Sequence, residues 1–197
     1  MAPRLLDDTN TRDRGGPGER VEALFFRSRN VVITGEIDHK LAQRAVTHLL
    51  ALAEEGEEPI TVFISSPGGH VESGDMVHDV IKFIRPTVRV VGSGWVASAG
   101  ALIFVGARRE NRYCLPNTRF LLHEPSGGIG GQVADMVIQA EQIRIMRERF
   151  HTLFAEATGQ TPGRIAEDTA RDFWLTARQA IEYGLVGEIV DGVDQIR

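Results

Sequence analysis

The sequence contains very little cysteine and no long apolar run. Cys114 is the only cysteine among 197 residues, so no disulfide can form within one chain, and a reducing compartment is expected. No run approaches the roughly 20 apolar residues of a transmembrane helix, so we expect no membrane partner. Residues 1–20 mix both charge signs and lack an apolar stretch, which argues against a secretory signal. These absences predict a cytoplasmic protein.

Lysine is also scarce, because only Lys40 and Lys82 occur in the chain. Acidic side chains outnumber basic ones by 27 to 22, and the net charge of -5 argues against a nucleic-acid partner, which would need a clustered basic excess. Neither lysine follows a glycine, so there is no P-loop for ATP. Cys114 has no companion cysteine, and no His-x-x-x-His or Cys-x-x-Cys spacing occurs, so no metal site is expected.

Short β-branched runs alternate with segments of helical periodicity, which predicts an α/β fold. We expect one domain over residues 21–197, preceded by a flexible arm or propeptide at 1–20. The expected strands cover residues 30–34, 60–66, 87–92, 112–115, 119–123 and 187–190. The expected helices cover residues 38–55, 73–84, 96–105, 133–158 and 162–169, and a last one opens with a capping-box pattern at 176–179.

The predicted helix at 133–158 is the longest periodic segment of the chain. Its apolar residues recur every three or four positions. A helix of about 25 residues would extend roughly 38 Å at 1.5 Å per residue, which is longer than a small domain needs to cover its own sheet. We therefore expect this helix to reach a partner subunit.

Ser98 lies among very small residues at a predicted strand-to-helix junction. Small neighbours let a substrate backbone approach, and the start of a helix offers N–H groups to a developing oxyanion. The alternative is a buried serine selected for close helix packing. The glycines of Pro67-Gly68-Gly69 are equally open to two interpretations, since they can form a simple turn or direct N–H groups into a site.

His123 closes a predicted strand and is followed by Glu124-Pro125, so its imidazole could stand at the mouth of a cleft and not inside the sheet. It is one of six histidines, so its position alone does not identify a catalytic base. Asp172 could equally be a surface ion-pair partner. Only the combination of Ser98, His123 and Asp172 points to nucleophilic catalysis.

From residue 30 onward, the sequence resembles the Clp protease proteolytic subunit family. The similarity consists of short motifs in a constant order. His123 lies 25 positions after Ser98, and Asp172 lies 49 positions after His123, as the family pattern requires. The matching segments are Ile64-Ser65-Ser66-Pro67-Gly68-Gly69, residues 94–100, Leu115-Pro116-Asn117, Leu122-His123-Glu124-Pro125, Thr158-Gly159-Gln160, Asp168-Thr169, Arg171-Asp172 and Glu182-Tyr183-Gly184-Leu185-Val186.

The resemblance implies a crotonase-like fold of repeated ββα units and a serine endopeptidase that degrades unfolded polypeptides. It assigns Ser98 as nucleophile, His123 as base and Asp172 as the acid that orients the base. It further implies an oxyanion hole formed by the N–H groups of Gly69 and Ala99. An extended substrate would pair with the backbone of two segments. Their residues are His70, Val71, Glu72, Gly127, Gly128, Ile129 and Gly130.

The resemblance also implies an assembly. Family members stack two heptameric rings into a tetradecamer through the long helix and enclose the active sites in a chamber. A separate AAA+ unfoldase of the ClpX, ClpA or ClpC type uses ATP to feed the chamber, so no cofactor is expected in this chain. The positions that match the family's unfoldase-docking pocket are Thr61, Phe63, Phe83, Tyr113 and Val190.

Several residues depart from the family pattern. Thr61 replaces a usual tyrosine, Ala99 replaces a methionine, and Ala170 replaces an acidic residue associated with ring-to-ring contacts. The N-terminal arm also differs from the family's apolar axial loop. These differences leave room for a paralogous subunit in the ring, and for the alternative that the chain is a structural or weakly active subunit beside an active paralogue. A crotonase-fold enzyme acting on acyl-CoA thioesters is a further alternative.

Overall fold

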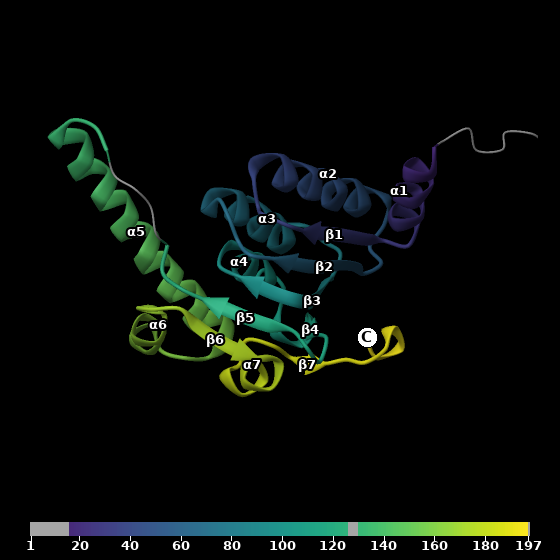
Figure 1. Ribbon diagram of the computed structural model, residues 1–197. Helices are drawn as coiled ribbons and strands as arrows, with labels where there is room; N and C mark the ends of the chain where they lie inside the picture. Colours follow the sequence, from purple (N-terminus) through teal and green to yellow (C-terminus); the bar gives the residue numbers. More distant parts are fainter. Residues whose placement is uncertain (1–15, 126–129, 197) are drawn as a thin grey trace, which may run out of the picture.

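The structure is a computed structural model that describes residues 16–125 and 130–196 (Figure 1). Helices and strands alternate along most of the chain. In chain order they are α1 (Pro17–Arg27), β1 (Asn30–Thr34), α2 (His39–Glu55), β2 (Ile60–Ser66), α3 (Val71–Phe83), β3 (Val88–Ala97), α4 (Ala99–Phe104), η1 (Arg109–Asn111), β4 (Arg112–Cys114), β5 (Arg119–Leu122), α5 (Val133–Thr158), α6 (Pro162–Thr169), β6 (Phe173–Thr176), α7 (Ala177–Tyr183), β7 (Glu188–Ile189) and η2 (Val193–Gln195).

The strands form one sheet in the order β1-β2-β3-β4-β7, with every neighbouring pair parallel. A second branch leaves from β3, where β5 pairs in parallel and β6 pairs with β5 antiparallel. Helices connect successive parallel strands, as a parallel sheet requires. The strand β3 is therefore common to both branches of the sheet.

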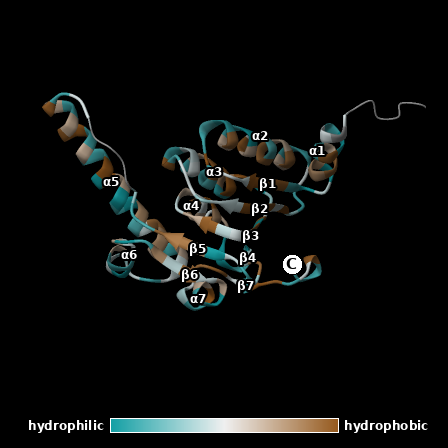
Figure 2. Ribbon diagram, viewed as in Figure 1, coloured by the Kyte–Doolittle hydropathy of each residue, from teal (hydrophilic) through white to brown (hydrophobic). Residues whose placement is uncertain are grey.

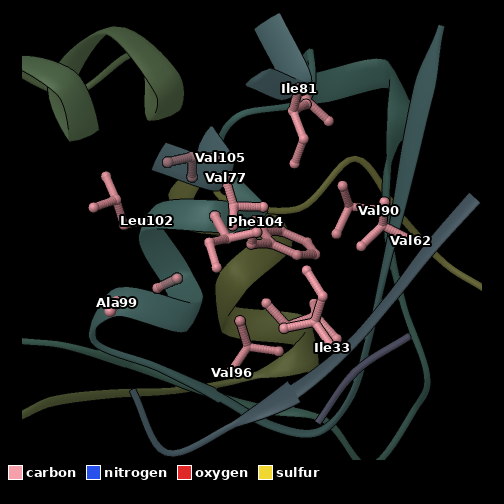
Figure 3. Packing of buried hydrophobic residues seen from close by; sticks show 14 of the residues in the cluster. Ile33, Val62, Val77, Ile81, Val90, Val96, Ala99, Leu102, Phe104 and Val105 are labelled. Atoms are coloured by element: carbon pink, nitrogen blue, oxygen red, sulfur yellow. The ribbon is translucent and has the colours of Figure 1, made fainter. Parts of the chain in front are cut away.

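The main core fills the space between the sheet and helices α2, α3 and α4. Figure 3 shows Phe104 of α4 at its centre, beside Val62 of β2 and Val90 of β3. The ring of Phe104 meets that of Phe120 edge-on, with the ring centroids 5.2 Å apart. This packing fixes the short helix α4 against the strands, and α4 begins directly after Ser98.

The structure corrects the predicted end of the third strand. The expected strand stopped at residue 92, whereas β3 continues to Ala97 and the following helix begins only at Ala99. The strand contains an irregularity between its pairs Ile64↔Gly92 and Ser66↔Val96. Along this stretch β3 changes its other neighbour from β4 to β5, so the glycine-containing stretch is a continuation of the strand and not its end.

Two further elements differ from the prediction. The arm was expected to include residues 17–20, but these form the first turn of α1, where the carboxylate of Glu19 accepts from the Gly16 N–H at 2.9 Å. Residues 17–20 are thus helical, residues 1–15 lie outside the described residues, and the boundary of the arm stays a prediction. The strand β6 was also not predicted. The capping box at the start of α7 is confirmed, because Thr176 and Gln179 cap each other reciprocally.

Helix α5 has 26 residues and extends away from the sheet (Figure 1). Only its C-terminal part contributes buried side chains, among them Phe150 and Phe154. Hydrophobic residues also occur on the projecting part (Figure 2), where Val133, Val137 and Ile138 are each more than 60% exposed. In the described ranges, no helix combines the length and apolar character needed to span a membrane.

Candidate active site

The predicted triad residues lie at the ends of three neighbouring strands. Ser98 follows β3, His123 follows β5 and Asp172 precedes β6. Because β3 and β5 are parallel while β6 is antiparallel to β5, these three ends lie at the same edge of the sheet. The topology thus brings together residues that are far apart in the sequence.

The register of β3 and β5 fixes where Ser98, the predicted nucleophile, lies along the sheet. Ala97 pairs with Leu121, and the N–H of Ser98 donates to the carbonyl of Leu121 at 2.9 Å. Ser98 is therefore held by its backbone to the strand that carries the candidate base.

The register of β5 and β6 relates the base to the acid. Leu122 pairs with Phe173 at the end of the antiparallel ladder. One further step along both strands brings His123 opposite Asp172, since antiparallel partners advance in opposite directions. Asp172 is exposed, and His123 is half-buried.

Ser98 has an unusual backbone conformation, with a φ of 53° and a ψ of -121°. Positive φ is uncommon for a residue that carries a side chain, and such strain is often found at functional sites. A nucleophile on a sharp strand-to-helix turn presents its hydroxyl at the top of the sheet. Here the turn joins β3 to α4, and Ser98 is the N-cap residue of α4.

Glycines make room for this turn. A Cβ on Gly68 would lie 2.6 Å from the Cβ of Ser98 and 3.1 Å from its Oγ. A Cβ on Gly74 would lie 3.1 Å from that of Ala99, which is itself buried. Sequence reasoning assigned no role to Gly74, although its place in the first part of a helix near a glycine turn was a possible signal.

The two predicted oxyanion donors have free N–H groups within the described part of the chain. Ile37 bridges the glycine turn, donating to the Gly68 carbonyl and accepting from the His70 N–H, both at 2.8 Å. That bridge leaves the N–H of Gly69 without an acceptor among residues 16–125 and 130–196. The N–H of Ala99 is likewise unpaired there, because it opens helix α4.

The three predicted triad residues lie at neighbouring strand ends, but their side chains are not hydrogen-bonded to one another. No hydrogen bond or ion pair of Ser98, His123 or Asp172 side chains occurs within the described residues. The neighbouring Glu124 is well connected by contrast. Its carboxylate accepts from His151 Nε2 at 3.0 Å, and its N–H donates to the carbonyl of Thr169 at 3.2 Å. Sequence reasoning missed both Glu124 and His151.

The residues predicted to pair with substrate fall into two groups, one in and before helix α3 and one largely outside the described residues. The N–H of His70 is bonded to Ile37 and its carbonyl accepts from Gly74, while Val71 and Glu72 form the first turn of α3. This segment is therefore not a free strand edge in the structure. Gly130 is described and exposed, whereas Gly127, Gly128 and Ile129 lie outside the described residues.

The predicted docking residues are partly grouped. Tyr113 and Val190 are buried in a small cluster against which Phe63 packs. Thr61 lies two residues before Phe63 on β2, and so on the same face of that strand. Phe83 is separate from this cluster and 80% exposed at the end of α3.

A cleft of about 750 Å³ lies elsewhere, between the C-terminal ends of α3 and α5. Its lining includes Lys82, Arg85 and Arg108 but none of the triad residues. Among the described residues, no group of three His, Cys, Asp or Glu side chains could hold a metal ion.

Comparisons with known proteins agree with this description. The family model "Clp protease" matches residues 17–193. The ATP-dependent Clp protease proteolytic subunit of Paracoccus denitrificans is 62% identical over 188 residues, covering 95% of this chain and 94% of that protein. Proteolytic subunit 2 of Pseudomonas aeruginosa is 51% identical, covering 92% and 94%.

The fold is also similar to a solved structure. ClpP1 from Listeria monocytogenes matches with a TM-score of 0.82 and 48% sequence identity, covering 90% of this chain and 99% of that chain. The predicted α/β, crotonase-like fold and the predicted family are confirmed.

Proposed function

Because the chain belongs to the Clp protease family, we propose that it is a serine endopeptidase whose catalytic groups are Ser98, His123 and Asp172. The observation that carries this assignment is the meeting of the three strand ends at one sheet edge, with Ser98 on a strained strand-to-helix turn. A Ser-His-Asp set is recognised by such roles and geometry and not by its order in the chain.

Each residue has a distinct step in the reaction. Ser98 Oγ attacks the scissile carbonyl while His123 takes the hydroxyl proton, and His123 later gives that proton to the leaving amine. Asp172 fixes the tautomer and orientation of the imidazole and stabilises it when it is charged. A water molecule then gives a proton to His123 and attacks the carbonyl of the acyl-enzyme. His123 returns the proton to Ser98 Oγ, and the product with the new carboxyl end is released.

The unpaired N–H groups of Gly69 and Ala99 support an oxyanion hole. Ala99 directly follows Ser98, Gly69 follows the Gly68 that packs against Ser98, and each N–H is free within the described residues to donate to an oxygen that becomes negatively charged. Removing one such donor typically costs about 2.7–4 kcal/mol in the barrier. Ala99 contributes through its backbone, so the absence of a methionine side chain at this position does not remove the donor.

The substrates we propose are unfolded polypeptides, cleaved in an enclosed chamber formed by rings of this subunit. The relatives' name, ATP-dependent Clp protease proteolytic subunit, supports a separate ATPase partner. Phe63, which is half-buried against the buried side chains of Tyr113 and Val190, is our candidate for part of its docking surface. We propose a cytoplasmic location, and paralogous subunits in the ring are compatible with this function.

Labelling with a fluorophosphonate followed by peptide mapping tests the catalytic assignment. We expect one modified residue, Ser98, in the assembled protein, and loss of both labelling and peptide hydrolysis in Ser98→Ala with the oligomer intact. Labelling at a different serine would refute the mechanism. An assembled protein that is never labelled would instead favour a structural subunit that depends on an active paralogue.

A further inference from the structure

Glu124 connects three parts of the molecule next to the catalytic base. Its carboxylate accepts a hydrogen bond from Nε2 of His151 on α5 at 3.0 Å and lies 3.8 Å from the guanidinium of Arg147. Its backbone N–H donates to the carbonyl of Thr169 at the end of α6. The segment that follows Thr169 leads directly to Asp172. Glu124 therefore joins β5, α5 and the chain that carries the acid.

This connection lies where the sheet no longer holds the backbone. The ladder between β5 and β6 ends at the pair Leu122↔Phe173, so His123 is the first residue beyond it. The side chain of His123 makes no hydrogen bond within the described residues. The next residue, Glu124, is held by hydrogen bonds to Thr169 and His151. These bonds set the direction in which the backbone leaves the strand.

The Glu124–His151 pair is partly protected from water. The side chain of His151 is 12% exposed and that of Glu124 is 28% exposed. Among the other ion pairs of α5, the one between Arg144 and Glu148 has side chains that are 47% and 60% exposed. Burial makes a bond between Glu124 and His151 more specific in geometry than such a surface pair, which is weakened by solvent. Because a carboxylate only accepts, His151 carries its proton on Nε2.

We infer that Glu124 and His151 are positioning residues for the catalytic base, and that their hydrogen bond holds His123 in line with Ser98 and Asp172. The inference rests on the proposed function, since it assumes that His123 is the base. Catalytic groups must be held close to the productive geometry, and a misplacement of about 1 Å can cost about a hundredfold in rate. The pair also makes the position of the base depend on α5, the helix that projects from the domain.

Paired substitutions separate the hydrogen bond from general packing. Glu124→Ala and His151→Leu each remove it. Glu124→Gln keeps an acceptor of the same size, and His151→Gln keeps a donor at a similar reach. Glu148→Ala is the matched control, because it breaks an ion pair on the exposed face of the same helix. Peptide hydrolysis, fluorophosphonate labelling rate, thermal unfolding and sedimentation are measured for each assembled variant.

We expect Glu124→Ala and His151→Leu to lower kcat and the labelling rate about tenfold or more, with KM within about twofold. The pH profile of labelling should shift in the same two variants, because the base has lost its alignment. The glutamine variants should recover most of the rate. The double variant Glu124→Ala with His151→Leu should be no worse than either single one, as expected for one shared interaction.

Equal labelling rates in the parent and in both disruptive variants would overturn the inference, as would losses that follow oligomer dissociation or unfolding alone. Failure of the glutamine variants to recover any rate would also count against it. These results differ from failure of the proposed function, in which the assembled parent protein itself would not be labelled at Ser98.

Discussion

At the residue scale, the conformation of Ser98, the proposed nucleophile, depends on the small size of the glycines packed against it. Ser98 has a positive φ, and Gly68 approaches so closely that an added Cβ would lie 2.6 Å from the Ser98 Cβ. Gly68 itself has a φ of +101°, which disfavours any side chain. The glycine turn and the serine turn are thus packed as one unit, and a change in either displaces the other.

Gly68→Ala tests this dependence. We expect the free energy of unfolding to fall by about 1–3 kcal/mol from backbone strain. We also expect the fluorophosphonate labelling rate at Ser98 to fall about tenfold or more, because a displaced nucleophile no longer faces its base. Gly163→Ala in α6 is the control, since an added Cβ there meets nothing within 4 Å. Unchanged labelling in Gly68→Ala would contradict the proposed packing.

Cys114 gives a second prediction at this scale. The residue is fully buried in β4, and burial raises the pKa of its thiol to about 12. Since only the thiolate reacts with alkylating reagents, native protein at pH 8 should react with iodoacetamide at least tenfold more slowly than protein unfolded in denaturant. Mass spectrometry over time measures both rates. Similar rates in the two states would show that the thiol is accessible in the fold.

At the scale of elements, α3 and α4 are joined by a buried histidine. His78 on α3 is 2% exposed, and its Nδ1 lies 2.9 Å from the carbonyl of Leu102 on α4. Desolvation lowers the pKa of His78 below its usual 6.5, although the bond to Leu102 partly opposes this. Helix α4 follows the nucleophile directly, so this contact stabilises the helix that presents Ser98.

The lowered pKa of His78 predicts a loss of stability on acidification. Below pH 6.5 the unfolded chain binds a proton at this histidine, whereas the folded chain resists it until the lower folded pKa is reached. The contribution of neutral His78 to the free energy of unfolding is therefore complete above pH 6.5 and declines as the pH falls below that value. We expect the parent to lose more Tm between pH 7 and pH 5 than His78→Gln does. His39→Gln, at an exposed position on α2, should behave like the parent.

Most elements could be predicted from the sequence because their periodicity is strong. The strands β1 and β2 and the helices α2, α5 and α6 have nearly the predicted bounds. The misses have physical causes. The strand β3 passes through Gly92 and Gly94, which look like a strand end, and only pairing with β5 shows that it continues. The four residues of β6 are too few to show a period.

The site was predictable in part. The resemblance indicated Ser98, His123 and Asp172, and the structure brings their strand ends to one edge. The Glu124–His151 bond could not be predicted, because it joins residues 27 positions apart through the way α5 packs on the domain. Such a contact depends on tertiary structure and leaves no local pattern in the sequence.

At the scale of the whole molecule, α5 extends beyond its own domain. The helix has 26 residues, but its buried side chains begin only at Phe150. Val133, Val137 and Ile138 expose apolar surface on the projecting part. Exposed apolar surface of this kind marks protein–protein contact. A second copy of the chain can cover it, as expected for a family that stacks rings.

Val137→Glu therefore should prevent complete assembly. A buried carboxylate without a partner would be strongly unfavourable in an apolar subunit contact, whereas the same side chain is harmless in the separate subunit. Sedimentation velocity should show smaller species, and peptide hydrolysis should fall with the loss of the assembled state. Gln139→Glu adds the same charge at another exposed position of α5 and should leave more of the assembly intact. If Val137→Glu sedimented like the parent, the exposed face of α5 would not be the contact between copies, and the apolar side chains there would need a different partner.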